Sequence, residues 1–217
     1  MLNLTQEEID ALKKHLAKDE SLYEVQPELF DLFFEVGRVK TFGRHEVIMQ
    51  PGVKVREVYV VIDGLVASTY MSGNKVVMQA LATPGTMMLH GGSFFNRRPS
   101  FMQWEALVRT RLLCIPETIV RDYLKDNHEF AIWMYGMAEN NILSAEEKTH
   151  ILADTAEQRY RKLASNLPRR VFKELSSRVM ASYLGITEQS LSRIKRIVIQ
   201  EDRERERAFE EGHGDDY

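Results

Sequence analysis

Cysteine is nearly absent from this 217-residue chain, which has only Cys114. One thiol excludes an internal disulfide framework, a CxxC redox pair, a structural zinc ribbon and an iron–sulfur cluster held by four cysteines. Long hydrophobic runs are also absent, since no stretch approaches the ~18 consecutive apolar residues of a membrane-spanning helix. The acidic first eight residues lack the basic and apolar regions of a signal peptide. We therefore expect a cytoplasmic protein that does not use the membrane as a partner.

Catalytic signatures are missing as well. The sequence contains no GxSxG, HExxH or Walker A motif, and its six histidines are not at metal-ligand spacing. The segment His90-Gly91-Gly92-Ser93 is similar to an esterase oxyanion loop, but without a nucleophile elbow a plain glycine turn explains it. We therefore expect neither an enzyme nor a metal site.

The charge of the chain is unevenly distributed. Residues 155–200 hold ten Lys or Arg and three Asp or Glu, a net +7, whereas residues 201–217 hold eight acids and three Arg, a net −5. A solvated helical surface would explain such a basic segment, and a face that binds a polyanion is the alternative. The segment 201–217 is expected to be either a charged extension of the preceding helix or a disordered tail, and we adopt the second interpretation.

The first half of the chain has the pattern of short antiparallel strands. Short helices are expected at 5–16, where Thr5 and Glu8 form a capping box, and at 27–34. The segments that follow are rich in Val, Ile and Tyr and are separated by glycine-containing turns every eight to twelve residues or so, which is typical of a sandwich or small barrel. The expected strands are 36–42, 46–49, 57–62, 65–71, 75–81 and 105–115, with hairpin tips at Asp63-Gly64 and Gly73-Asn74.

Helical spacing replaces the strand pattern after Pro116. An a/d series of alternating four- and three-residue steps begins at Phe130, Met134, Met137 and Asn141 and continues, with more polar residues, to Ile151. Such a stripe is either ordinary core or the seam along which a long helix, expected over 126–153, pairs with a second copy of itself. We adopt the second interpretation, with Asn141 as a polar residue that fixes the register.

Residues 178–196 carry the most specific motif. Small Ala181, Gly185 four residues later and Leu191 six residues beyond have the spacing of a helix-turn-helix, in which two helices cross closely, glycine forms the turn and leucine anchors the second helix. Thr187 is the expected N-cap of the second helix. Its outward face would then present Glu188, Gln189, Ser190, Ser192, Arg193 and Arg196. Together with the local +7 charge, this motif predicts double-stranded DNA as the partner.

This motif resembles the C-terminal helix-turn-helix of the Crp/Fnr superfamily of bacterial transcription regulators. Gln50-Pro51-Gly52 and the segment 60–66 resemble that family's N-terminal β-roll, and residues 126–153 resemble its long dimerisation helix. The resemblance implies an α+β fold with an effector domain at 1–125, a dimerisation helix at 126–153 and a winged helix-turn-helix domain at 154–200. It also implies a homodimer on a palindromic operator, with RNA polymerase as a further partner.

The effector cannot be carried over from the resemblance. Cyclic-nucleotide binders of the family have a Gly-Glu pair and an Arg-Ser/Thr-Ala triplet before the last strands, and here Ser100-Phe101 stands where Arg-Ser would be expected. We therefore expect no cyclic nucleotide. Arg97 or Arg98 could replace the missing arginine, and His90 with His150 could ligate a haem, so both alternatives stay open. The pocket candidates are His90, Arg97, Arg98 and Ser100.

The resemblance also assigns roles on the second helix of the motif. Arg193 matches the family's base-contacting arginine, and Gln189 stands where members often have glutamate, which changes the expected base from cytosine to adenine. Base reading is expected from Gln189 and Arg193 with Ser190, Ser192 and Glu188, and phosphate binding from Thr187, Arg178 and Arg196. The alternative function is a diverged roll that binds a small molecule or a protein and no longer engages DNA.

Overall fold

The computed structural model describes residues 2–19, 25–151 and 154–212, and side chains at 144–151 and 205–212 and at a few single positions are not described. The chain divides into two compact units, Met1–Glu147 and Lys148–Tyr217. The boundary falls inside a long helix, α5 (His128–Ile151). Among the described residues no helix is long and apolar enough to cross a membrane.

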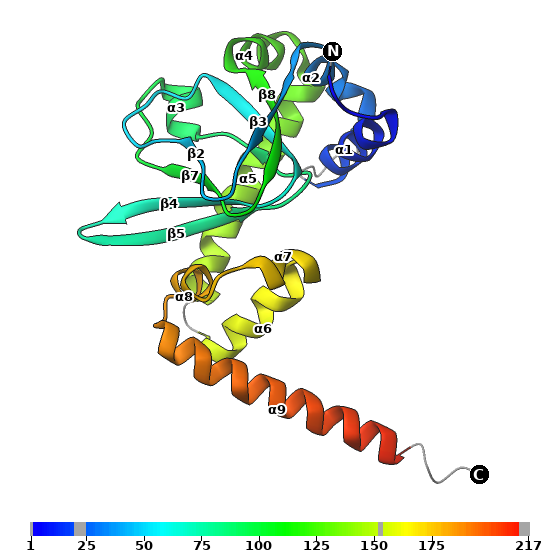
Figure 1. The fold of residues 1–217 in the computed structure, drawn as a ribbon. Coiled ribbons are helices and arrows are strands. Elements are labelled where there is room, and N and C mark those ends of the chain that lie inside the picture. The colour runs from blue at the N-terminus through cyan, green and yellow to red at the C-terminus, as the bar shows by residue number, and fades with distance from the viewer. Residues whose placement is uncertain (1, 20–24, 152–153, 213–217) are drawn as a thin grey trace. The chain divides into compact units, whose positions relative to one another are not determined.

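The first unit is built on two four-stranded antiparallel sheets (Figure 1). One sheet has the order β1-β8-β3-β6 and the other β2-β7-β4-β5. This arrangement confirms the expected antiparallel roll. The strands are β1 (Arg38–Phe42), β2 (Val47–Met49), β3 (Glu57–Asp63), β4 (Val66–Ser72), β5 (Lys75–Ala82), β6 (Met87–Met88), β7 (Gln103–Ala106) and β8 (Thr110–Pro116).

Two expectations about the strands are wrong. The expected strand 105–115 is two strands, β7 and β8, which belong to different sheets. Asp63-Gly64 is not a hairpin tip, because it carries the chain from β3 in one sheet to β4 in the other, where Gly64 lies against Thr110. The second tip is correct: Gly73 has φ +58° and joins β4 to β5, with Ser72 opposite Lys75.

Helices at the start of the chain and the first half of α5 complete the core of this unit. The helices α1 (Gln6–Asp19), η1 (Pro27–Phe30) and α2 (Asp31–Val36) come first. The capping box is confirmed, since the Glu8 carboxylate accepts from Thr5 N at 2.8 Å and Thr5 Oγ1 accepts from Glu8 N at 3.2 Å. Phe30 packs edge-on against Trp133 of α5 with ring centroids 4.9 Å apart, and Trp133 Nε1 donates to the Leu16 carbonyl at 2.9 Å.

Three of the four residues expected to form the dimer seam lie on the face of α5 that packs against the chain's own core. Phe130, Met134 and Met137 are only 0%, 2% and 3% exposed and pack in the chain's own core. The alternative interpretation of this stripe, ordinary core, is therefore correct for these three residues. Asn141 is exposed and donates to the Met137 carbonyl, so its role at a seam stays a prediction. The opposite face carries the exposed Tyr135 and Ile142.

The second unit is helical. After α4 (Glu117–Asp126) and α5 come α6 (Ala156–Asn166), α7 (Arg169–Glu174), α8 (Ser177–Leu184) and α9 (Glu188–Gly212). Thr155 caps α6 through a complete capping box with Gln158. No strand follows the motif within the described residues to 212, so the expected wing is replaced by the continuation of α9. Residues 201–212 continue α9, so the alternative of a helix extension is correct for the described part of this segment and the disordered tail is wrong there.

The burial of Phe130 predicts a large loss of stability on truncation. Phe130→Ala should lower the free energy of unfolding of the first unit by about 3–5 kcal/mol, because it opens a cavity between α2 and α5. Urea unfolding followed by tryptophan fluorescence checks this. The matched control is Tyr135→Ala on the exposed face of the same helix, and similar losses for both variants would contradict the assignment of faces.

Candidate DNA interface and ligand cavity

The helix-turn-helix forms as the motif predicts. Ser176 caps α8 by accepting from Val179 N at 3.2 Å. Gly185 ends that helix in the left-handed conformation with φ +66°, which glycine adopts without a Cβ penalty. Thr187 Oγ1 accepts from Ser190 N at 3.1 Å and so caps α9, as expected. The turn between the two helices is therefore fixed by side chains that the sequence identifies.

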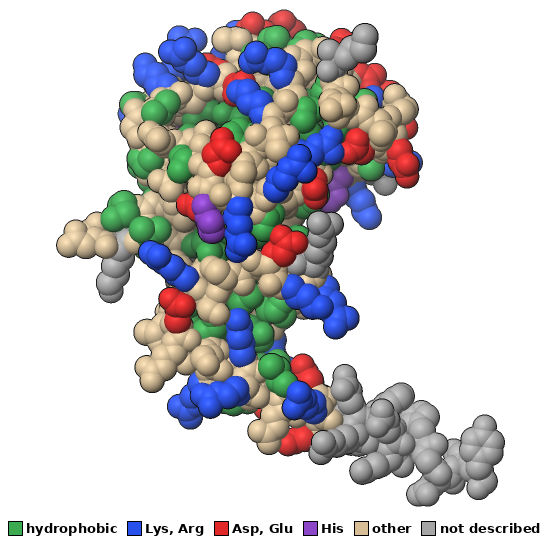
Figure 2. Space-filling model, viewed as in Figure 1, with side chains coloured by type: hydrophobic (Ala, Val, Ile, Leu, Met, Phe, Trp, Pro, Cys, Tyr) green, Lys and Arg blue, Asp and Glu red, His purple; other side chains and the backbone are tan. Residues whose placement is uncertain are grey.

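Burial separates the two faces of the motif. Ala181 is 3% and Leu191 0% exposed, and both lie in the contact between α8 and α9. Every side chain expected to reach DNA is exposed, and Figure 2 shows Lys and Arg side chains on the surface of this unit. The exposed set is Arg178, Thr187, Glu188, Gln189, Ser190, Ser192, Arg193 and Arg196. The structure thus brings the candidates together on one helix and its flank, and their individual roles stay predictions.

Arg161 of α6 is an anchor that the sequence argument did not identify. Its guanidinium pairs with Glu157 on its own helix at 3.1 Å, with Glu201, and with Asp202 at 3.6 Å. These carboxylates hold the pKa of Arg161 above its usual range, with the Glu157 hydrogen bond as the largest cause. The first acids of the segment that was expected to be a tail therefore fasten α9 to α6.

A cavity of about 510 Å³ lies in the first unit, and we call it the roll cavity. Its walls come from β4, β5, β6, β7, the start of α3 (Gly91–Asn96) and the second half of α5. Met88, Met102 and Trp104 are among its apolar walls, and Trp104 Nε1 donates to Ser68 Oγ at 3.0 Å. Its volume is in the range of small-molecule sites.

Only one of the four expected pocket residues lines the roll cavity. His90 does, whereas Arg97, Arg98 and Ser100 do not. Ser100 is 1% exposed. Its hydroxyl accepts from Met102 N at 3.0 Å, which closes a turn. Arg97 ends α3 in the left-handed conformation and, like Arg98, is exposed. The alternative in which Arg97 or Arg98 replaces the missing phosphate-binding arginine is therefore wrong for this cavity.

A hydrogen bond fixes the orientation of the His90 ring. Its Nδ1 accepts from Ser93 N at 3.0 Å, which caps α3 and leaves the ring proton on Nε2. Burial lowers the pKa of His90. The second haem candidate, His150, lies outside the residues whose side chains are described, and the proposed pair with His90 is untested.

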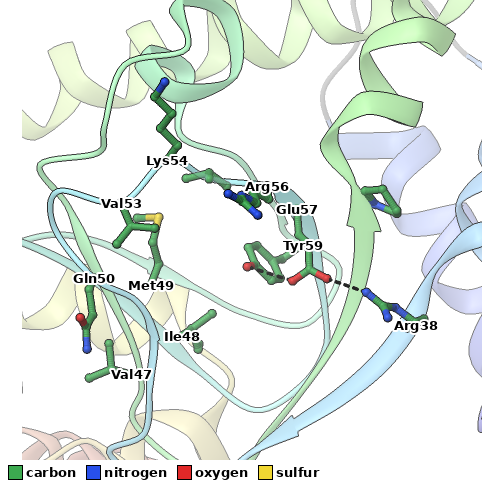
Figure 3. A pocket seen from close by; sticks show the side chains of 12 residues that line it. Arg38, Val47, Ile48, Met49, Gln50, Val53, Lys54, Arg56, Glu57 and Tyr59 are labelled. Atoms are coloured by element: carbon green, nitrogen blue, oxygen red, sulfur yellow. Dashed lines mark hydrogen bonds and ion pairs between the residues drawn. The ribbon is translucent and has the colours of Figure 1, made fainter.

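A second cavity, which we call the edge cavity, opens at one end of the roll (Figure 3). Its volume is about 830 Å³, and Arg38, Val53, Arg56 and Tyr59 are among the residues that line it. The Glu57 carboxylate in its wall is already engaged, with Arg38 at 3.3 Å and Lys40 at 2.6 Å. Burial and the nearby Glu57 raise the pKa of Tyr59, so its hydroxyl stays protonated.

The remaining reactive side chains offer no second site. Cys114 is fully buried in β8, and burial raises the pKa of its thiol to about 12, so it is an inert small hydrophobic residue, as expected. His45 pairs with Glu105 at 2.8 Å. In the part of the chain that the structure describes, no three His, Cys, Asp or Glu side chains could together hold a metal ion.

The left-handed turn at Gly185 gives a testable consequence. Gly185→Ala should lower the free energy of unfolding of the second unit by about 1 kcal/mol, because a Cβ disfavours φ +66°. Gly185→Asn is the matched variant and should cost less, since asparagine tolerates this conformation. Thermal unfolding followed by circular dichroism measures both. Equal tolerance of alanine and asparagine would argue against the turn described here.

Comparisons with known proteins agree with this architecture. Residues 39–127 match the cyclic nucleotide-binding domain family. FixK2 from Bradyrhizobium japonicum is a structural neighbour with 21% identity and a TM-score of 0.69, over 77% of this chain and 86% of that one. The c-di-GMP responsive regulator CLP of Xanthomonas campestris has 13% identity and a TM-score of 0.65, over 82% and 93%. No curated protein sequence matches the chain.

The catabolite activator protein of Thermus thermophilus is a further neighbour, with 17% identity and a TM-score of 0.52 over 83% of this chain and 86% of that one. At such identities the likeness concerns the fold. Residues 39–127 are therefore similar to the cyclic nucleotide-binding domain, and the chain has the fold of the Crp/Fnr-type transcription regulators.

Proposed function

We propose that this protein is a DNA-binding transcription regulator that acts in the cytoplasm as a homodimer on a palindromic operator. The observation that carries the proposal is that α9 has one buried face and one exposed face. Leu191 and Ile194 are buried, whereas Gln189 and Arg193 are exposed. A helix with one anchored face and one polar, basic face is what a major groove accepts. Two such helices in a dimer would lie about 34 Å apart along the operator.

The DNA-binding part of the proposal is tested by selection. The purified protein is titrated into a randomised duplex pool at two salt concentrations, and the bound fraction is sequenced. Enrichment of a palindrome with affinity that falls as salt rises supports a sequence-specific regulator. Absence of binding at low salt favours the alternative function, a roll that binds a small molecule or protein and does not engage DNA.

Arg193→Ala separates base reading from phosphate binding. We expect a loss of about 1–3 kcal/mol on the selected operator and a much smaller loss on a scrambled duplex, because a bidentate contact to guanine is specific to sequence. Arg203→Ala is the matched control, since Arg203 is exposed on the same helix beyond its anchored part. Fluorescence anisotropy gives both affinities. Equal losses on the two duplexes would make Arg193 a phosphate contact.

The outer face of α5 supports the homodimer. Ile132, Tyr135, Glu139 and Ile142 follow one another at steps of three, four and three residues, which is an a/d series on the face opposite the core. Tyr135 is 68% and Ile142 62% exposed in the single chain. Three of these four positions carry large apolar side chains, and their spacing suits a second copy of the helix packed in register.

Tyr135→Glu tests this seam. A charge at a buried helix–helix contact should convert a dimer into a monomer at micromolar concentration, as measured by light scattering. The matched control is Met71→Glu, an exposed apolar residue near the β4–β5 turn, which should leave the mass unchanged. A monomeric parent protein, or the same dimer in both variants, would refute the seam.

We also propose that the effector is not a cyclic nucleotide. The support is the composition of the roll cavity, since no lysine or arginine lines it among the residues whose side chains are described. A cyclic phosphate enclosed there would lose its hydration without a counter-charge, which is costly in an apolar site.

A further inference from the structure

The lining of the roll cavity has a distinct chemical character. Its described wall residues include no Asp, Glu, Lys or Arg, and most of them are aliphatic, aromatic or methionine side chains. Methionine and aromatic walls adapt to flat, polarisable molecules. The cavity therefore favours a neutral ligand over an ion of either sign.

One oriented donor lies in this apolar wall. Because His90 Nδ1 accepts from Ser93 N, the ring's remaining proton is on Nε2. The ring is also fixed by an edge-to-face contact with Phe101, with centroids 5.5 Å apart. A fixed donor in an apolar wall selects a ligand with an acceptor atom.

The mouth of the cavity exposes more apolar surface than a folded chain normally leaves in water. Phe95, Phe101 and Ile142 all line the cavity and are 50%, 63% and 62% exposed. Exposed apolar side chains gathered around one cavity mark a binding site rather than scattered surface residues.

We propose that the roll cavity binds an uncharged, largely apolar aromatic molecule that accepts one hydrogen bond from His90 Nε2. The ligand would contact α5 directly, since Met137, Ala138, Asn141 and Ile142 form one wall. Its regulatory meaning rests on the proposed function, because Ile142 also belongs to the proposed dimer seam. The binding itself does not depend on that function.

The test uses Nile red, an uncharged planar dye with a carbonyl acceptor, titrated into the full-length protein while its fluorescence is recorded. We expect saturable binding with a blue-shifted emission. Ala80→Trp should weaken it at least tenfold, because Ala80 lines the cavity and the indole would fill it. His90→Asn should weaken it about tenfold: asparagine keeps the cap on Ser93 N and removes the Nε2 donor.

Matched variants separate these effects from damage to the fold. Val53→Trp adds the same indole in the edge cavity and should leave dye binding unchanged. Circular dichroism and thermal unfolding must show Ala80→Trp and His90→Asn folded as the parent protein. Cyclic AMP at millimolar concentration should not displace the dye.

Five results would overturn the proposal. The first four are the absence of saturable binding, equal affinity in the folded Ala80→Trp variant, unchanged affinity in His90→Asn, and displacement by cyclic AMP. Loss of dye binding as the protein dimerises would show that a second copy covers the mouth, and would overturn it too.

Failure of the proposed function is distinguishable from failure of this inference. Arg193→Ala should bind the dye like the parent protein. Dye binding in a protein that never selects DNA would refute the proposed DNA-binding function and support the ligand site. DNA selection without dye binding would support the DNA-binding function and refute the ligand site.

Discussion

The packing of the inner face of α5 against the aromatic cluster of η1 and α2 is the contact on which the first unit depends. Phe130 and Trp133 lie with ring planes 18° apart, and Phe33 meets Phe130 edge-on at 5.6 Å. Trp133 is also tied to α1 through the Leu16 carbonyl. Because the N-terminal helices, the roll and α5 all meet here, the rotation of α5 about its axis is fixed by the chain itself. The exposed face of α5 and the wall that it gives to the roll cavity follow from this rotation.

Met137 connects these two consequences. It is buried in the core with Met134 and also lines the roll cavity, one turn before Asn141 and Ile142. A ligand in the cavity would therefore touch residues adjacent to the proposed seam without any intervening element. Such a ligand can shift the arrangement of two paired helices only by binding one arrangement more tightly than the other. The short path makes that difference physically reasonable, since displacing Asn141 or Ile142 changes what a second helix meets.

Much of this architecture is predictable from local patterns, and the failures have a common cause. Thr5, Gly185 and Thr187 act through neighbours within three or four residues, so caps and turns follow from sequence spacing. The a/d series of α5 is a true helical periodicity, but periodicity does not say which partner covers a stripe, and here η1 and α2 do. Likewise, Asp63-Gly64 has the sequence of any two-residue hairpin tip, but in the structure it joins β3 to β4 of the other sheet and Gly64 lies against Thr110. Among the pocket candidates only His90 lines the cavity. His90 precedes α3 and Arg97 follows it, and the sequence did not predict this short helix between them.

The continuation of α9 explains how the helix-turn-helix is held without a wing in its described residues. In an isolated motif the second helix is anchored only through its N-terminal turns, at Leu191 and Ile194. Here Val198 extends the buried side by one more turn, and Arg161 then draws Glu201 and Asp202 onto α6. Partly exposed ion pairs of this kind contribute little stability singly, but three carboxylates around one guanidinium restrict orientation. The same acids compensate the positive charge of Arg161 on α6. The extension therefore fixes the candidate reading face of α9 through contacts that lie beyond it.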